Sequence, residues 1–294
     1  MMALLIGTGV KPALALSGFS SPAFWVLLTV LFYGFAVKKT GLAERISCYI
    51  LSLFPCTYRG ILSALFAIGF TLALGIPSMT VRTAIVVPVA WALVQSLGLP
   101  ARGRGSALIV LTTIEMAVVP GLAFLYGALS GPVVEAAFQA KHIPLSWFGY
   151  ARYLTFPTVL LCGLILASNM IVLRPEPIPG ASHGFARDRL RGLGRLQRPE
   201  LITAIIVVLS IVFWTTEGYH HLPGFFAGMI EMVVFAVAGI LRDEEIGTGV
   251  SRERGDHFSE VQTNRQRALA ERTQARLTGV ISGSAASDPG NRAF

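Results

Sequence analysis

Cysteine is scarce in this sequence, which contains only Cys48, Cys56 and Cys162. They are widely spaced and form no C-x-x-C motif, so neither a disulfide framework nor a zinc site is predicted. The sequence also lacks a Ser-His-Asp set, paired carboxylates, a metal-ligand cluster and a phosphate-binding loop. One H-x-x-x-x-D spacing, His183 and Asp188, falls in a linker rich in Arg, Gly and Pro, and we interpret it as chance. The sequence therefore does not predict an enzyme.

Charged residues are scarce as well, at 14% of the chain against about 25% in soluble domains. Hydrophobic residues make up 53% of the chain, and the mean hydropathy is +0.64. This composition predicts an all-α, polytopic protein of the cytoplasmic (inner) membrane. The net charge of +8 comes from basic residues, whose positions in a membrane protein indicate which loops are cytoplasmic. The arginines lack the aromatic interleaving that base stacking uses, so nucleic acid is not a predicted partner.

Apolar stretches of spanning length alternate with polar segments along 1–241, the predicted membrane domain. The polar linker 174–198 holds six arginines against two acids, which predicts a cytoplasmic position. The stretch 130–144 is predicted to be an external loop. Residues 44–54 are too short to span and carry charge at one end, which favours an interfacial helix. The expected spans are 18–37, 106–126, 147–173, 201–216 and 222–241.

The central run, 60–99, is predicted to be a re-entrant helical hairpin. Arg59 precedes it, and Arg102 and Arg104 follow it, so a single crossing would place these cytoplasmic markers on opposite sides. Two arms that meet at a Gly/Pro break return the chain to the side it left. Irregular backbone at membrane depth is typical of transporter sites, where hydroxyls and backbone groups bind ions. A Pro-kinked helix with satisfied hydroxyls is the alternative interpretation.

Three strings, in this order, resemble the divalent anion:sodium symporter family of citrate, dicarboxylate and sulfate carriers. They are GFSSPAFWVLL…KKTGLAERIS (18–47), IPSMTVRTAIVVPV (76–89) and the helix pair that begins RPELITAIIVV (198–241). The resemblance implies the first of two inverted repeats, each with a re-entrant hairpin. The implied function is sodium-coupled uptake of di- or tricarboxylates by alternating access, with sodium as the coupling ion and no other cofactor.

By this resemblance, the hydroxyls of Ser78 and Thr80 contact the substrate carboxylate, while Met79 stands where the family has Asn. Sodium is expected near the backbone of Gly75, Ile76, Pro77 and Ser78, because hard cations prefer oxygen ligands. An intramembrane charge is a functional hypothesis by default, so Arg82 is a candidate partner of the carboxylate. Snorkelling or the capping of carbonyl groups is the alternative role for Arg82.

Four further residues are weaker candidates for the same site. Glu115, in a spanning segment, is a candidate for tuning the coupling ion, with a structural carboxylate as the alternative. Gly121, Gly127 and Gly131 are candidates for lining an unwound second half of the site. Glu231, on the last predicted span, is interpreted as structural.

No second hairpin follows Leu241. The segment 242–294 carries eight arginines, eight acids and no lysine, and is predicted to be a disordered cytoplasmic tail or an out-of-frame segment. Three alternatives therefore stay open: a truncated fragment, a half-transporter that needs a second-half chain, and a proton-coupled or arsenite-type permease. The predicted partners are the lipid bilayer, a carboxylate anion, sodium, and either a second copy in a homodimer or a complementary chain.

Overall fold

The computed structural model describes residues 22–139, 141–143, 145–178, 184–220, 222 and 224–241, all of which belong to the unit Met1–Leu241. The predictions that concern His183, the beginning of the first span and the segment 242–294 lie outside the described residues. Every regular element in the described part is helical, and five helices are long and apolar enough to cross a membrane. The predicted all-α polytopic architecture is confirmed.

The first two described helices meet at a sharp turn. Helix α3 (Pro22–Thr40) ends in Lys38 and Lys39, and α4 (Leu42–Ser52) follows after Gly41. Gly41 has a φ of 78°, a left-handed conformation that glycine adopts without strain. Helix α4 buries Leu42, Ala43, Ser47, Cys48 and Leu51, and Tyr49 is exposed. The interfacial position of 44–54 stays a prediction.

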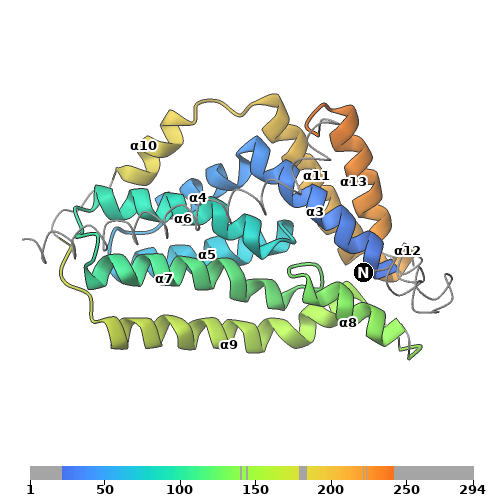
Figure 1. Ribbon diagram of the computed structural model, residues 1–294, viewed down its shortest axis with the longest axis horizontal. Helices are drawn as coiled ribbons and strands as arrows, with labels where there is room; N and C mark the ends of the chain where they lie inside the picture. The colour runs from blue at the N-terminus through green and yellow to red at the C-terminus, as the bar shows by residue number, and fades with distance from the viewer. Residues whose placement is uncertain are drawn as a thin grey trace, which may run out of the picture. The chain divides into compact units, whose positions relative to one another are not determined.

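Two 18-residue helices, α5 (Tyr58–Gly75) and α6 (Met79–Ser96), occupy the run predicted to be a hairpin (Figure 1). Each packs mainly against the helix that follows, α7 (Arg104–Val118), and each is long and apolar enough to cross a membrane, so re-entrance stays a prediction. Thr57 caps the start of α5 by accepting a hydrogen bond from the amide of Gly60. Helix α5 ends at Gly75, and Pro77, which has no N–H to donate, follows two residues later. We call the connecting residues Ile76–Ser78 the hairpin tip.

The next spanning segment is broken where its Pro-Gly pair predicts. Helix α7 (Arg104–Val118) gives way to the short 3-10 helix η2 (Val119–Ala123). The predicted external loop is wrong in its first part, because 130–139 form α8 (Ser130–Gln139). Pro132 stands in its first turn, where its missing N–H costs nothing, and buried Glu135 accepts a hydrogen bond from the Tyr126 hydroxyl.

Helix α9 (Trp147–Leu173) has the predicted bounds, and few of its residues are buried. The basic linker contains the short helix α10 (Phe185–Gly192). Helices α11 (Arg198–Thr215), α12 (Glu217–His220) and α13 (Phe225–Val237) complete the described chain.

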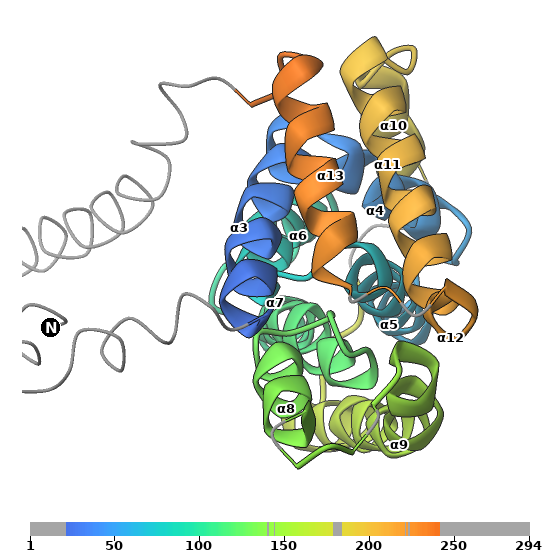
Figure 2. The same cartoon turned by 90° about the vertical axis from the view of Figure 1, so that its right-hand side faces the viewer.

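The helices form two groups, which Figures 1 and 2 show from two sides. In the first group, α5, α6, α7 and α9 run side by side, and Figure 2 views them nearly end-on. In the second group, α3 and α13 pack closely against each other and α11 lies beside them, crossing the first group at a steep angle. The hairpin tip lies where the groups meet, because Gly34 of α3 is within contact distance of Ser78.

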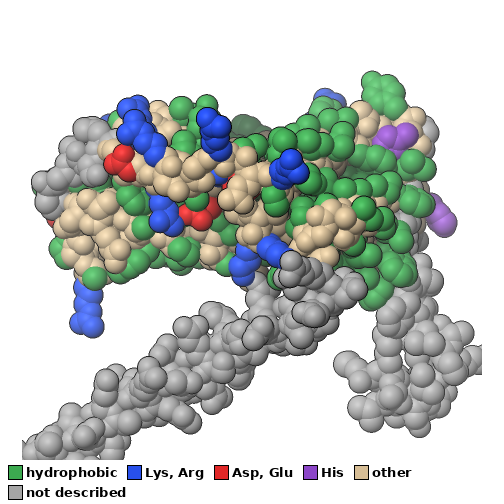
Figure 3. Space-filling view, turned by 90° about the horizontal axis from the view of Figure 1, so that it is seen from above, with side chains coloured by type: hydrophobic (Ala, Val, Ile, Leu, Met, Phe, Trp, Pro, Cys, Tyr) green, Lys and Arg blue, Asp and Glu red, His purple; other side chains and the backbone are tan. Residues whose placement is uncertain are grey.

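Basic residues of distant segments gather near α4 and α10. Arg45 forms an ion pair with Glu200, at 3.0 Å from Nη2 to Oε2, and also donates to the carbonyls of Leu193 and Gly194. Arg189 pairs with Glu44 at 2.9 Å. In Figure 3, Lys and Arg side chains lie mostly over the left half of the view, while hydrophobic side chains predominate in the right half. The cytoplasmic position of the basic segments stays a prediction.

Candidate functional site at the hairpin tip

The hairpin tip brings the start of a helix into the interior of the protein. Ile76 and Pro77 are buried, and Ser78 is half-buried. Ser78 is the N-cap of α6, and its Oγ accepts a hydrogen bond from the amide of Val81 at 3.4 Å. The first amides of a helix have no partner within the helix and carry partial positive charge. The start of α6 therefore offers amide donors to an anion.

Met79 and Thr80 form the first turn of α6. Met79 is half-buried and its carbonyl accepts a hydrogen bond from the hydroxyl of Thr83, whereas Thr80 is exposed. The Thr80 hydroxyl is therefore accessible to a ligand, while the Ser78 hydroxyl already serves the helix cap. Both remain the predicted substrate contacts.

Arg82 is completely buried, and its guanidinium faces the backbone. Its Nε donates to the carbonyl of Ala117 at 2.7 Å, and its Nη1 donates to the carbonyls of Gly127, at 2.8 Å, and Ile76. One side chain thus ties the hairpin tip to both sides of the break after α7. These contacts match the carbonyl-capping alternative, and they leave only Nη2 without a partner among the described residues.

Gly121 and Gly127 make this close packing sterically feasible. A Cβ at Gly121 would lie 2.4 Å from Nη2 of Arg82 and 2.4 Å from the carbonyl oxygen of Gly127. A Cβ at Gly127 would lie 2.6 Å from the carbonyl oxygen of Gly121. Real Cβ atoms do not approach other atoms so closely, so both positions require glycine. The structure brings these two predicted residues to the hairpin tip.

Gly131 and Glu115 have other neighbours. Gly131 packs against the carbonyl of Leu125. Glu115 accepts a hydrogen bond from the side-chain amide of Asn169, which also donates to the hydroxyl of Thr112. The described contacts of Glu115 therefore link α7 to α9, as the structural alternative for this carboxylate expects.

Oxygen atoms are the only hard ligands that the tip provides for sodium. No group of three or more His, Cys, Asp or Glu residues is placed to hold a metal ion in the part of the chain that the structure describes. The possible sodium ligands near Gly75, Pro77 and Ser78 are carbonyl and hydroxyl oxygens, which suit a hard cation. The carbonyl of Ile76 already accepts a hydrogen bond from Arg82, which fixes its direction.

Sequence reasoning missed the partners of Arg82, because backbone carbonyls carry no sequence signal. Their arrangement also depends on residues 35 and 45 positions away along the chain. The one signal was the presence of an arginine within an apolar run, close to the Gly-Ile-Pro break and upstream of a second Pro-Gly break.

Residues 1–247 match the family model described as the sodium:sulfate symporter transmembrane region. The chain belongs to the sodium:sulfate symporter family. This finding confirms the resemblance that the three sequence strings carry.

The curated relatives that match this chain are longer than the part that aligns with it. A membrane protein of Cupriavidus necator is 27% identical over 220 residues, which are 73% of this chain and 42% of that protein. The chloroplastic dicarboxylate transporter 1 of Spinacia oleracea is 23% identical over 239 residues, 79% of this chain and 42% of the relative. The chloroplastic dicarboxylate transporter 1 of Arabidopsis thaliana is 24% identical over 242 residues, which are 79% of this chain and 43% of that protein. The chain spans about half the length of the curated relatives it matches.

Proposed function

We propose that this chain supplies one binding hairpin of an anion transporter, whose substrates are di- or tricarboxylates such as citrate, succinate and malate. The observation that supports this most directly is the start of α6, which opens its amides beside a buried guanidinium at a break in the backbone. Membership of the symporter family and the names of two dicarboxylate-transporting relatives support the same class of substrate.

In this proposal the anion binds at the first turn of α6. Thr80 offers an accessible hydroxyl, and the adjacent amides offer the positive end of the helix. Arg82 acts through the carbonyls of Ile76, Ala117 and Gly127, which it holds in one arrangement. Arg82 is thus a positioning residue for the hairpin tip.

Sodium is the proposed coupling ion, bound by carbonyl and hydroxyl oxygens around Gly75, Pro77 and Ser78. A cation at this position raises the affinity for the anion, and by linkage the anion raises the affinity for sodium to the same degree. A proton-coupled or arsenite-type permease is the competing proposal, and it predicts uptake that does not depend on sodium.

Uptake of radiolabelled succinate and citrate into proteoliposomes tests the proposal. The chain is reconstituted alone and together with a chain that carries the rest of a family member, with an inward sodium gradient or an equal choline gradient. Sodium-dependent uptake by the chain alone would exclude the non-transporting fragment, and uptake that needs the second chain would favour a half-transporter. Uptake in neither reconstitution would contradict the proposal.

A variant pair links the uptake to the tip. Thr80→Val removes the accessible hydroxyl at nearly constant volume, and we expect about a tenfold loss of apparent anion affinity. Thr215→Val, at the exposed end of α11, is the matched control because its hydroxyl bonds only to carbonyls of its own helix. An equal loss in the two variants would remove Thr80 from the site.

A further inference from the structure

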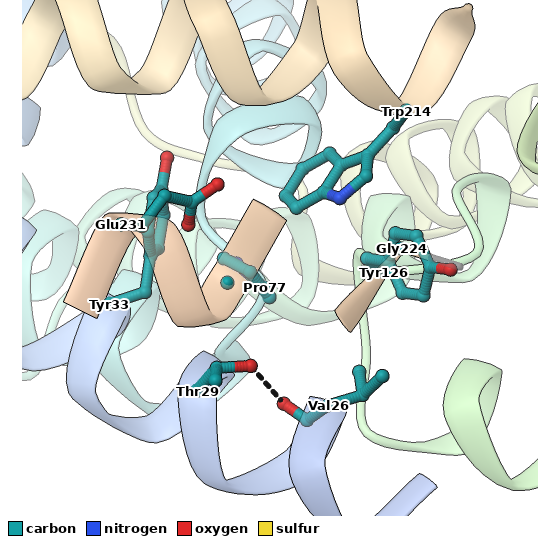
Figure 4. A pocket seen from close by; sticks show the side chains of 9 residues that line it. Val26, Thr29, Tyr33, Pro77, Tyr126, Trp214, Gly224 and Glu231 are labelled. Carbon is teal, nitrogen blue, oxygen red and sulfur yellow. Dashed lines mark hydrogen bonds between the residues drawn. The ribbon is translucent and has the colours of Figure 1, made fainter. Parts of the chain in front are cut away.

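A small cavity lies next to the hairpin tip, on the side of the second helix group. Its volume is about 10 Å³, roughly the space of one water molecule. Pro77 contributes from the tip, Tyr33 from α3, Trp214 from α11 and Glu231 from α13, and Figure 4 shows these side chains around the cavity. We call it the Glu231 cavity.

Three polar groups at this cavity have no hydrogen-bond partner among the described residues. They are the hydroxyl of Tyr33, the indole N–H of Trp214 and the Oε1 atom of Glu231. These side chains are 2%, 5% and 7% exposed. An unpaired buried polar group costs about 1–3 kcal/mol. Three such groups around one small space point to an occupant that binds them together.

The cavity is maintained by close packing between α3 and α13. Gly228 precedes Glu231 by one helical turn, and a Cβ at this position would lie 2.4 Å from the hydroxyl oxygen of Thr29. Gly224, one turn earlier, has the same relation to the Tyr126 hydroxyl, at 2.2 Å. Both glycines line the cavity, so the helix face that carries Glu231 can approach α3 and Tyr126.

Charge balance indicates what the occupant is. No Lys, Arg or His of the described residues lies within ion-pair distance of Glu231. The groups beside it are the Tyr33 hydroxyl and the neutral Ser210 of α11, with Tyr126 and its partner Glu135 further along the cavity wall. A water molecule alone would satisfy hydrogen bonds but would not neutralise an ionised Glu231, so the buried carboxylate requires either a proton or a metal cation.

We propose that the Glu231 cavity binds one monovalent cation, either sodium or a proton carried by the Glu231 carboxyl group. The carboxylate of Glu231 supplies the negative charge, and the Tyr33 hydroxyl supplies a second oxygen ligand. Trp214 forms another part of the cavity wall, so that its indole reports on the occupant. This site is separate from the predicted sodium position around Gly75–Ser78.

Occupancy of this site acts on the hairpin tip through Pro77, which forms part of the cavity wall. A bound cation holds α3, α11 and α13 against the tip, and its release removes that attraction. The inference does not depend on the proposed anion transport, because cation binding is measured without any anion.

Trp214 provides a local probe of the cavity. Fluorescence of the full chain in lipid nanodiscs is recorded, and the signal of a Trp214→Phe variant is subtracted to remove the other three tryptophans. Sodium is titrated at constant ionic strength against choline, and pH is titrated separately without sodium. We expect a saturable change with one of these two cations.

Variants of the cavity decide the result. Glu231→Gln should abolish the response, and Tyr33→Phe should weaken the apparent affinity roughly tenfold. Glu200→Gln is the matched control, because Glu200 is similarly buried, at 6% exposed, but is paired with Arg45. The Trp214 fluorescence response should persist in this variant. A sodium response identifies sodium as the occupant, and a pH response alone identifies a proton on Glu231.

Two outcomes would overturn the proposal. One is a Trp214 signal that responds to neither sodium nor pH in the folded chain, whose helicity is checked by circular dichroism. The other is a response of equal amplitude and midpoint in Glu231→Gln. Loss of succinate uptake with an intact Trp214 response would contradict the transport proposal and leave the cation site standing.

Discussion

Two buried charges adjoin neighbouring residues of the hairpin tip, and their surroundings differ. Arg82, of the first helix group, donates to three backbone carbonyls, one of which belongs to Ile76. Glu231, of the second group, has an oxygen without a partner beside a cavity that Pro77 helps to line. Each group keeps one atom without a partner among the described residues, Nη2 of Arg82 and Oε1 of Glu231. Three backbone carbonyls hold the guanidinium in place, whereas the carboxylate adjoins a cavity that can take a ligand.

The largest expected loss of stability comes from removing the guanidinium of Arg82. Arg82→Met leaves the carbonyls of Ile76, Ala117 and Gly127 unpaired in the interior, and we expect a loss of roughly 3–5 kcal/mol in the free energy of unfolding. Arg59→Met, at an exposed position, is the matched control and should change it by less than about 0.5 kcal/mol. Unfolding in mixed micelles followed by circular dichroism measures both, and equal stabilities would refute the bracing role.

Crowding the same guanidinium should have a smaller effect. Gly121→Ala places a methyl group against Nη2 of Arg82 and the carbonyl of Gly127, and overpacking of this kind costs about 1–3 kcal/mol. Gly163→Ala is the control, because its Cβ would meet nothing within 4 Å on α9. That variant should be neutral or slightly stabilising, since alanine favours helices. The same unfolding assay would contradict the prediction if the order of the two variants were reversed.

A third variant set compares a buried ion pair with an exposed one. Arg45 and Glu200 are 15% and 8% exposed, while Arg189 and Glu44 are 55% and 28% exposed. We expect a coupling energy of about 1–2 kcal/mol for the first pair and below about 0.5 kcal/mol for the second, because solvent screens exposed charges. Double-mutant cycles with Gln replacements measure both couplings, and 0.5 M salt should weaken the second pair more.

The last comparison concerns the pH dependence of a third buried acid, Glu135 of α8, which lies outside the five candidate spans. Burial, with a contribution from the charge of Glu217, raises the pKa of Glu135 from 4.5 to about 7. The unfolded chain loses this proton near pH 4.5, whereas the folded chain retains it until about pH 7. The contribution of Glu135 to stability is therefore full below pH 4.5 and is lost as the pH rises to about 7.

Glu135→Gln should flatten that part of the pH profile, which we expect to fall by on the order of 1–2 kcal/mol in the parent chain. Measurement of the free energy of unfolding between pH 4.5 and 8 tests this. Asp188→Asn serves as the control, because this carboxyl group of the basic linker is 72% exposed. A profile that stays unchanged on removal of Glu135 would assign the pH dependence to other groups.

Local chemistry made much of the fold predictable. The Gly-Ile-Pro-Ser break ends one helix and caps the next, so the break between two helices followed from residues 75–78. The re-entrant path was inferred from Arg59, Arg102 and Arg104 and stays a prediction. Helix α9 was predicted with its observed bounds, because Ser146 caps its start and the apolar run continues to Arg174. Helix α8 was not predicted, since its Gly-Pro start is typical of a loop and its stability depends on packing against α3.

The site was predictable only in its local part. Ser78, Thr80 and Arg82 lie within five residues of one another, and Gly121 and Gly127 were inferred from a second break. The contacts of Arg82 and the cavity at Glu231 depend on how α3, α7, α11 and α13 pack, and no residue pattern encodes that packing. A lone acid in a spanning segment gives the same signal whether it is structural or ligand-binding.

Helix α9 has a further consequence for how the protein sits in a bilayer. Tyr153 near its start is well exposed and suits the interfacial region, and Arg174 caps its far end. The twenty residues between them span about 30 Å, the thickness of the hydrocarbon core. Thinner bilayers will therefore tilt α9, and the hydrogen bond from Asn169 to Glu115 will transmit that tilt to α7 and its break. The thickness of the surrounding bilayer thus influences the position of the helices that hold the hairpin tip.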